Sequence, residues 1–345
     1  MNKKYLNLII GLIIVILFSY IAFKNVSLEE LGKALKAVKY IYLIPAVMLI
    51  ALTFLFRAMR WRYLVSSIKD VKTTHLFSPL MVGFMGNVLP ARAGEFIRAY
   101  LLGKKENISF SASFATIVVE RLFDMLMFLG LLVGVLLFSA DILSQGSSGD
   151  NHNLMSIMKT FGWTSFALAI AIFSFFVLLQ HKNDWAMKIV RTCIRPFPHK
   201  WGEKIVKMVD SFTDGLKILK DVRGFLASLI LSFLVWGAMV LTYYPILLAF
   251  GLESQLPVIP AMFIVSLSIG IFISLFPTPA FLGSFHLACV VALHEVFGIS
   301  EAIAASYGII AWLVAMGFII IVGLLFILKD NISISELATS RDRAK

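Results

Sequence analysis

Long apolar runs separated by short basic segments are the feature that most limits how this chain can fold. A helix needs about 20 predominantly apolar residues to cross a bilayer, and several runs reach that length. Hydrophobic residues make up 59% of the 345 residues and charged residues only 15%, whereas an ordinary globular domain is about 25% charged. Because backbone exposed to lipid must satisfy its own hydrogen bonds, these runs predict helices. We therefore predict an all-α, polytopic helical membrane protein that forms one integral membrane domain over residues 1–345.

Clusters of Lys and Arg indicate which loops face the cytoplasm. Basic loops are retained beside anionic lipid on that side, so the net charge of +11 needs no nucleic-acid partner. The segment after the second apolar run is basic, and the loop at residues 180–223 holds ten Lys or Arg. We expect both segments, both termini and a short tail at residues 329–345 to lie in the cytoplasm. The basic residues after the second run are Arg57, Arg60, Arg62, Lys69 and Lys72.

Six full crossings and two broken or re-entrant hairpins account for the apolar runs. The predicted crossings are residues 5–23, 40–57, 111–139, 161–179, 224–250 and 302–328. The predicted connections are an amphipathic segment at 24–39, an outer loop at 140–160 and, inside the cytoplasmic loop, a surface helix at 201–220.

Two segments interrupted by proline and glycine are predicted to enter the membrane without crossing it. Residues 76–90 are short, have basic residues on both sides and lead into an amphipathic cytoplasmic helix at 91–104. Residues 257–297 form two apolar arms without Lys or Arg, which favours entry from the outer side. Paired broken segments in two halves of a chain point to an inverted repeat and a transport site. The alternative is that proline and glycine are simply common in membrane helices.

Three ionisable residues lie inside the apolar run at residues 111–139. Glu120 and Asp124 are four residues apart and share a helix face, and Arg121 precedes Asp124 by three. An ionisable residue at membrane depth costs about 2.5–3.5 kcal/mol on insertion scales, so a function or a neutralising partner is expected. Two acids and one base leave a negative charge, for which Arg92 or Arg98 is the nearest partner in sequence. The cluster either borders a polar path in a water-filled cavity or only locks helices together.

The first break supplies a second group of polar residues. Arg92 and Arg98 suit a lipid phosphate because a guanidinium donates two parallel hydrogen bonds to its oxygens. Glu95 lies between them and would orient one arginine or receive a cationic headgroup. Pro90 and Gly94 allow the backbone to turn at membrane depth. The alternative is that the arginines only anchor this segment at the cytoplasmic surface.

The second break is also rich in proline and glycine. It contains Pro277, Pro279, Gly283 and His286, which we predict to belong to the substrate-binding or translocation site. Helix ends exposed at such a break present backbone amides that bind anions. His286 is alternatively a packing or hydrogen-bonded residue. His294 lies eight positions further on, a poor spacing for a shared metal ion.

Motifs for catalysis or cofactor binding do not occur in the sequence. The H-E-x-x-H, P-loop, G-x-S-x-G and dinucleotide patterns are all absent. The two cysteines, Cys193 and Cys289, match neither a disulfide framework nor a metal motif. We expect no cofactor, no metal site and no catalytic residues.

Three motifs resemble those of the flippase-like membrane family, which includes the transmembrane flippase region of lysylphosphatidylglycerol synthase. They are LPARAGEFIR at residues 89–98, VERLFD at 119–124 and PTP at 277–279. The resemblance covers nearly the whole chain. It implies a bacterial or archaeal inner-membrane protein that moves lipids or lipid-linked glycans between leaflets. The family's motif positions correspond here to Arg92, Gly94, Glu95, Arg98, Glu120, Arg121 and Asp124.

The later motif departs from the family's pattern. Relatives usually carry a glycine pair after the prolines and a glutamate soon after Gly283, where this chain has Ala280, Phe281 and His286. Without that glutamate, a cationic substrate such as a lysyl lipid is less well supported. The synthase also has a soluble aminoacyl-transfer domain, but only 17 residues follow the last predicted span here, so we expect no such enzyme activity.

These features favour translocation of a phospholipid or lipid-linked glycan between the leaflets of the inner membrane through a charged groove. Without a nucleotide site, the movement would be downhill, ion-coupled or driven by a partner. Two alternatives remain. One is a non-transporting membrane partner of a lipid or glycan synthesis enzyme. The other is a lipid-modifying aminoacyltransferase resembling phosphatidylglycerol lysyltransferase.

Overall fold

The computed structural model confirms a polytopic helical membrane protein. It describes residues 13, 15–88, 93–138, 221–276 and 278–332, with the separate positions 160, 163, 164, 167, 170, 171 and 174. These residues contain helices and no strand. Five helices in this part are long and apolar enough to cross a membrane, with mean hydropathy from 1.4 to 2.9. They are Tyr40–Ser66, Val222–Ala249, Val258–Leu275, Pro279–Val296 and Glu301–Lys329.

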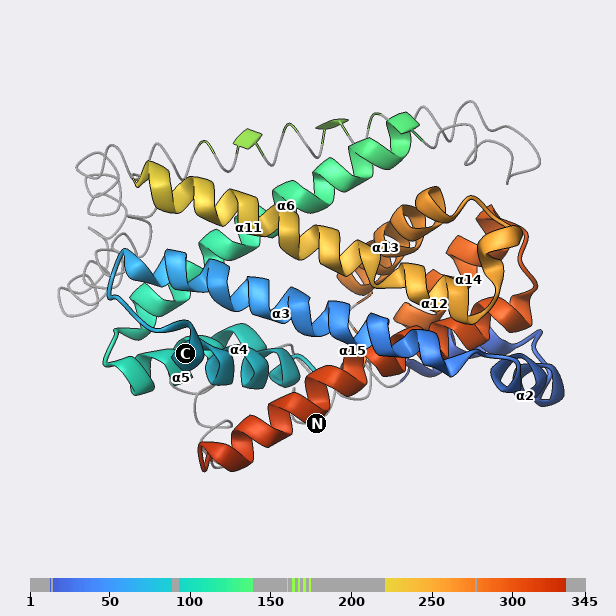
Figure 1. The fold of residues 1–345 in the computed structure, drawn as a ribbon, viewed down its shortest axis with the longest axis horizontal. Helices are drawn as coiled ribbons and strands as arrows, with labels where there is room; N and C mark the ends of the chain where they lie inside the picture. The colour runs from blue at the N-terminus through green and yellow to red at the C-terminus, as the bar shows by residue number, and fades with distance from the viewer. Residues whose placement is uncertain are drawn as a thin grey trace.

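Four long helices form the centre of the molecule. They are α3 (Leu43–Ser66), α6 (Phe110–Phe138), α11 (Val222–Leu241) and α15 (Glu301–Lys329). α3 and α11 pack along each other, α6 crosses behind them, and α15 runs obliquely past α3 (Figure 1). At about 1.5 Å per residue, the shortest of the four reaches the thickness of a membrane core, about 30 Å.

A short helical hairpin lies at one end of these long helices. Its arms are α4 (Thr73–Gly86) and α5 (Gly94–Glu106), and they pack against each other (Figure 1). Arms of 14 and 13 residues extend only about 20 Å each. We predicted a hairpin within residues 76–90, but α4 continues through Pro79 to Gly86, and the hairpin takes α5 as its second arm. The helix predicted at residues 91–104 corresponds to α5, which packs against α4.

Glycine allows the two arms of this hairpin to touch. A Cβ at Gly94 would overlap the carbonyl oxygen of Gly83 and Oδ1 of Asn87. The Gly94 N–H donates to the same Asn87 oxygen at 3.0 Å. Gly94 therefore serves close backbone approach, whereas the sequence had suggested a turn at membrane depth.

A second hairpin lies at the opposite end of the molecule. It consists of α13 (Val258–Leu275), the short turn η4 (Pro279–Phe281) and α14 (Ser284–Val290), which continues as η5 (Val291–Val296) beside α12 (Tyr243–Ala249) (Figure 1). This confirms the two apolar arms predicted at residues 257–297. Each arm has 18 residues, or about 27 Å, so the second hairpin is the deeper one.

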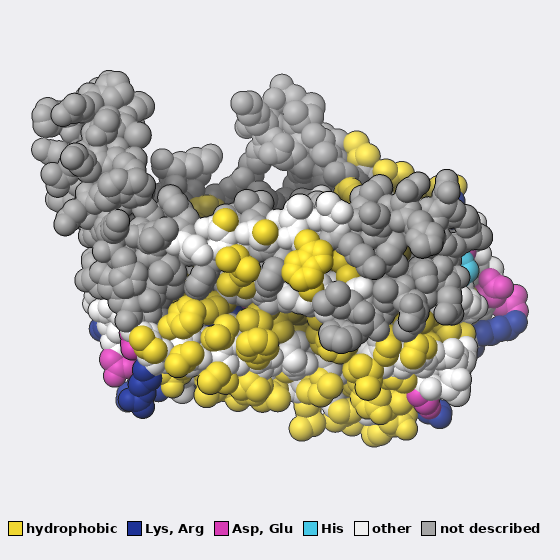
Figure 2. Space-filling view, turned by 90° about the horizontal axis from the view of Figure 1, so that it is seen from above, with side chains coloured by type: hydrophobic (Ala, Val, Ile, Leu, Met, Phe, Trp, Pro, Cys, Tyr) yellow, Lys and Arg dark blue, Asp and Glu magenta, His cyan; other side chains and the backbone are white. Residues whose placement is uncertain are grey.

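The surface is divided into an apolar band and charged ends. Figure 2 shows hydrophobic side chains along the length of one face, with Lys, Arg, Asp and Glu gathered toward both ends. One of the charged elements is α2 (Leu28–Lys36), an amphipathic helix with a capping box between Ser27 and Glu30. It confirms the amphipathic connector predicted at residues 24–39.

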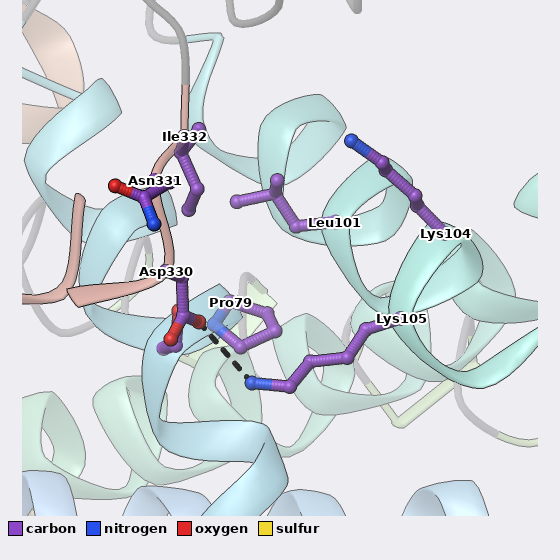
Figure 3. A pocket seen from close by; sticks show the side chains of 8 residues that line it. Pro79, Leu101, Lys104, Lys105, Asp330, Asn331 and Ile332 are labelled. Carbon is purple, nitrogen blue, oxygen red and sulfur yellow. Dashed lines mark hydrogen bonds and ion pairs between the residues drawn. The ribbon is translucent and has the colours of Figure 1, made fainter. Parts of the chain in front are cut away.

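The end of α15 is tied to the first hairpin. Nζ of Lys105 lies 3.2 Å from Oδ2 of Asp330, beside a shallow pocket of about 320 Å³ that Pro79, Leu101 and Ile332 also line (Figure 3). At the far ends of the same hairpin, Glu106 accepts from His75 at 2.9 Å. Ion pairs therefore hold the loops at this end of the molecule together.

Several predicted segments lie outside the described residues, wholly or in large part. They are the span at 161–179, the loops at 140–160 and 180–223 with the helix at 201–220, most of the tail at 329–345, and the start of the span at 5–23. Residues 13 and 15–23 of that first span are described and helical. The predicted number of crossings is therefore untested.

Candidate functional site

Buried charges meet where α3, α5 and α6 pack together. Glu120 and Asp124 lie one turn apart on α6, as their spacing predicts. Arg98 on α5 donates from both terminal nitrogens to the two carboxylate oxygens of Glu120, with Nη1 at 3.0 Å from Oε1. Glu120 is fully buried and Arg98 is 3% exposed. The structure therefore confirms Arg98 as a neutralising partner of the α6 acids.

A stacking contact fixes Arg98 in place. Its guanidinium carbon lies 3.6 Å from the ring centroid of Trp61, a fully buried residue of α3. The indole Nε1 of Trp61 in turn donates to Thr116 of α6 at 3.0 Å. A cation–π contact of this kind is worth about 2 kcal/mol when it is desolvated. Arg98, Trp61 and Thr116 therefore join three helices through one chain of contacts.

Arg60 fixes the second acid. Its Nη1 donates to Asp124 at 2.8 Å and to Ser232 of α11 at 2.9 Å. Nε1 of Trp236, one turn further along α11, also donates to Asp124, at 3.3 Å. Arg60 is fully buried, so its hydrogen bonds to Asp124 and Ser232 connect α3, α6 and α11 away from solvent.

Arg57 and Arg121 complete the cluster, Arg57 through a longer contact and Arg121 through two short ones. Arg57 donates to Asp124 at 3.4 Å, and its guanidinium lies 5.1 Å from the ring centroid of Phe84 on α4. Arg121 contacts Glu120 at 2.8 Å and Asp124 at 3.1 Å, and lies 6.0 Å from the same ring. Both guanidinium groups therefore reach one aromatic side chain.

A cavity of about 500 Å³ opens beside this cluster. Its polar wall consists of Arg57, Asn87, Glu95, Arg121 and Asp124. The remaining wall is mostly apolar and comes from both halves of the chain, with residues such as Ile50, Phe128, Met239, Ile269 and Ala315. Along α3 the lining runs seven positions from Arg57 to Ile50, about 10 Å. The cavity is thus amphipathic, with a charged end and a long apolar part.

The cavity is accessible from outside. The side chain of Arg121 is 41% exposed although it contacts two buried carboxylates. Ser274, near the end of α13, also lines the cavity and is exposed. The charge network therefore borders open space at Arg121 and is not packed against protein on all sides.

The predicted site residues divide into four groups. Glu95, Arg121 and Asp124 line the cavity, whereas Arg98 and Glu120 lie behind its wall. Gly94, Pro279, Gly283 and His286 are not among the lining residues. Arg92 and Pro277 lie outside the described residues.

The two breaks meet at the centre of the molecule. The N–H of Ala280 in the second break donates to the carbonyl of Val88 in the first, at 3.2 Å. The carbonyl of Ala280 accepts from Trp312 of α15 at 2.8 Å. The backbone N–H and C=O of Ala280 therefore both form hydrogen bonds within the protein. The next residue, Phe281, lines the cavity.

The backbone of the second break is left-handed at three positions. Ala280, Phe281 and Gly283 have φ of 51°, 58° and 78°. Only glycine adopts this region without cost, so Ala280 and Phe281 hold this conformation under strain. Gly283 also lies against the first helix, because a Cβ there would be 2.9 Å from the Cβ of Phe18.

His286 lies outside the cavity. Its ring is buried between Phe23, at 5.7 Å, and Trp312, at 6.0 Å between centroids. These aromatic neighbours favour the packing role over substrate contact.

Arg57 and Arg60 are the residues that sequence reasoning misplaced. We predicted them as anchors of a cytoplasmic loop after a span ending near residue 57, but α3 continues to Ser66 and buries both. The partner predicted for the net negative triplet is therefore present, but it is more than Arg98 alone, because Arg57 and Arg60 also face the two acids. The spacing of three between Arg57 and Arg60 places both on one face of an apolar helix, and this was the signal available in the sequence. Ser232 and Trp236 are four apart, so they also share a helix face.

Metal ligands do not gather in the described part of the chain, where no three His, Cys, Asp or Glu residues form a group able to hold an ion. Cys289 is free and buried, and Cys193 lies outside the described residues.

Comparisons with known proteins bear on this site. A family described as the lysylphosphatidylglycerol synthase TM region matches residues 8–323. A UPF0104 membrane protein of Methanothermobacter thermautotrophicus is 25% identical over 89% of this chain and 90% of its own length. A UPF0104 membrane protein of Pyrococcus horikoshii is 23% identical over 95% of this chain and 98% of its own length. Glycosyltransferase AglD of Haloferax volcanii is 25% identical over 79% of this chain but only 46% of its own length. No solved structure matches.

Proposed function

We propose that this chain, which belongs to the family of the lysylphosphatidylglycerol synthase transmembrane region, moves a phospholipid or a lipid-linked glycan between the leaflets of its membrane. The observation that supports this most is the amphipathic cavity of about 500 Å³ inside the helix bundle. A lipid has a polar end and an apolar end, and the cavity offers a wall for each. The same site residues, Glu95, Arg121 and Asp124, carry the family's motifs.

The mechanism follows from the cost of moving a polar headgroup through hydrocarbon. A polar group without hydrogen-bond partners there loses about 4–8 kcal/mol. Guanidinium and carboxylate groups already held in the bundle replace water around the headgroup, while acyl chains stay beside the apolar wall. The hydrogen bond between Val88 and Ala280 joins the two hairpins next to the cavity, so separation of the hairpins would change its opening.

The orientation of the chain is part of the proposal. With both termini in the cytoplasm of a bacterial or archaeal cell, α4 and α5 enter the inner membrane from the inside, and α13 and α14 enter from the outside. The headgroup site then lies nearer the cytoplasmic leaflet, since Arg57, Glu95 and Arg121 cluster around the first hairpin. The chain itself is proposed to have no aminoacyl-transfer activity.

Filling the cavity tests this function. Vesicles containing the purified chain and phospholipids with fluorescent acyl chains are exposed to an impermeant reductant, which reports how fast inner-leaflet probe reaches the outer leaflet. Ala315→Phe places a ring in the apolar part of the cavity and should slow transfer at least several-fold. Leu313→Phe, on the same helix but 49% exposed, is the matched control. Equal transfer by wild type and Ala315→Phe would reject the cavity as the path.

One observation favours a second candidate function. The match to glycosyltransferase AglD spans less than half of that protein, so the shared part accompanies further sequence there. This chain is then a non-transporting membrane partner of a lipid or glycan synthesis enzyme. Purified chain that transfers no lipid, but co-purifies stably with such an enzyme, would support the partner role. Thin-layer analysis of lipids from a deletion strain separates the roles further, because a missing lipid indicates synthesis and a mislocated one indicates transport.

A further inference from the structure

The charge balance around the cavity is positive. Arg57, Arg60, Arg98 and Arg121 face Glu120 and Asp124, and Glu95 adds a third carboxylate near Arg121. Within the described residues, the arginines of this cluster therefore outnumber its carboxylates by one. An excess charge at membrane depth is costly, so a bound counter-ion of opposite sign would stabilise it.

The four arginines do not share the same role. Arg60 and Arg98 make the short contacts that connect helices, and neither lines the cavity. Nε of each has no hydrogen-bond partner, and Nη2 of Arg60 lies 3.3 Å from Glu120. Arg57 and Arg121 line the cavity, which leaves these two, among the described residues, as the arginines of the cluster that can reach a ligand.

Arg57 has more unused hydrogen-bond donors than Arg121. A guanidinium carries five N–H donors, and Arg57 donates one hydrogen bond, at 3.4 Å to Asp124. The residue is only 7% exposed, but its other nitrogens are not among the fully buried atoms without a partner, so they keep surface on the cavity that Arg57 lines. A phosphate oxygen in the cavity would accept from this fork in the planar geometry that arginine favours.

Phe84 supports both cations on one side. It lies within 5.1 Å of Arg57 and 6.0 Å of Arg121, measured from the guanidinium carbon to the ring centroid, and it lines the cavity as well. Two arginines above one ring form a site for a group with several acceptor oxygens. A headgroup that also carries an amine would need a free carboxylate. The lining has two carboxylates: Asp124 is already occupied by Arg57, Arg60, Arg121 and Trp236, and Glu95 lies near Arg121, so an amine would have to compete with arginine for either of them.

We propose that the cavity selects lipids with a net negative, amine-free phosphate headgroup, and that Arg57 is the residue that determines this selectivity. The inference rests on the proposed lipid-moving function, of which it names the substrate class. Phosphatidylglycerol and polyprenyl phosphates have this chemistry.

Transfer of three probes with the same fluorescent acyl chain tests the selectivity. The probes are phosphatidylglycerol, which is anionic, phosphatidylcholine, which is zwitterionic, and lysylphosphatidylglycerol, which is cationic. Wild type should transfer the anionic probe about tenfold faster than the others, the effect of one charge-assisted hydrogen bond. Arg57→Gln should remove that advantage, and Arg57→Lys, which keeps the charge but loses the fork, should retain part of it. Arg62→Gln is the control, since Arg62 is on the same helix, half exposed, and pairs with Asp70 at 3.6 Å.

A binding measurement separates this inference from the function. Trp236 lines the cavity, so phosphatidylglycerol with brominated acyl chains should quench its fluorescence, and Trp236→Phe should abolish that part of the signal. Equal transfer of all three probes would overturn the selectivity and leave the function standing. Quenching by the anionic lipid alone, without transfer of any probe, would support the selectivity and overturn the function. An absence of both transfer and quenching would overturn both.

Discussion

Replacing Glu120 by glutamine should destabilise the fold more than any other single loss of charge in the bundle. Glu120 is fully buried, and three arginines lie within 3.3 Å of its carboxylate. Glutamine has nearly the same shape, so the change removes the charge and leaves the packing. Arg98 would then be a buried cation facing a neutral amide.

The size of the effect follows from these contacts. Removing one partner of a buried ion pair costs about 3–5 kcal/mol, mainly because the other charge remains buried and unpaired. The stacking of Arg98 on Trp61 and the amide oxygen of glutamine compensate in part, so about 3 kcal/mol is expected. With about 2 °C of Tm per kcal/mol in a chain of this size, the apparent Tm should fall by about 6 °C.

Thermal unfolding of the purified protein in detergent, followed by tryptophan fluorescence, measures this shift. Glu95→Gln is the matched control, because Glu95 is only half-buried and should cost less than about 1 kcal/mol. The double variant Arg98→Met with Glu120→Met, which removes both charges, should be more stable than Glu120→Gln alone. Equal Tm values for wild type and Glu120→Gln would refute the view that this carboxylate holds the arginines in place.

Three further predictions concern the hairpins. Gly94→Ala should lower the Tm, because the new Cβ would overlap Gly83 and force the two arms apart. The expected loss in the free energy of unfolding is about 1–3 kcal/mol or more. Gly130→Ala is the control and should not lower the Tm, because there is open space around Gly130. Ala280→Gly should raise the free energy of unfolding by up to about 1 kcal/mol, since φ is 51° there, and a lower Tm would contradict this strain. Burial alone would raise the pKa of Asp330, but hydrogen bonds from Ser78 and Lys105 lower it below its usual value. The stability from this lowered pKa is present above about pH 4 and is lost as the pH falls further, so the difference in Tm between wild type and Asp330→Asn should shrink on acidification.

Periodicity and length were enough to predict most of the described helices. The apolar runs at 224–250 and 302–328 correspond closely to the helices Val222–Ala249 and Glu301–Lys329. The break between α13 and α14 was visible from its prolines and glycine. The predicted end of the second span was wrong, because hydropathy alone places the end of the helix at Arg57, whereas α3 continues to Ser66.

The site was predicted in part for a physical reason. The acids of α6 could be found from the sequence because a charged residue inside a long apolar run indicates a functional site or a buried partner. Their partners could be found only if charges in two different helices were paired, and Arg60 reaches Asp124 across 64 positions. Sequence distance therefore favoured Arg98 and hid Arg57 and Arg60. The cavity itself depends on side chains from both halves and had no local signal.

The two hairpins resemble each other in shape but not in chemistry. Every charged residue in the lining of the cavity comes from α3, α5 or α6, whereas the lining that α11, α12, α13, α14 and α15 contribute is uncharged. A mechanism that passes a headgroup from one hairpin to an equivalent site on the other is therefore not supported by the described residues. In the proposed function, the first hairpin and α6 would hold the polar end of the lipid, and the second half would supply the wall around its apolar part. Movement of α13 and α14 against a fixed charged end is the simplest change that such an arrangement allows, because it disturbs none of the buried ion pairs.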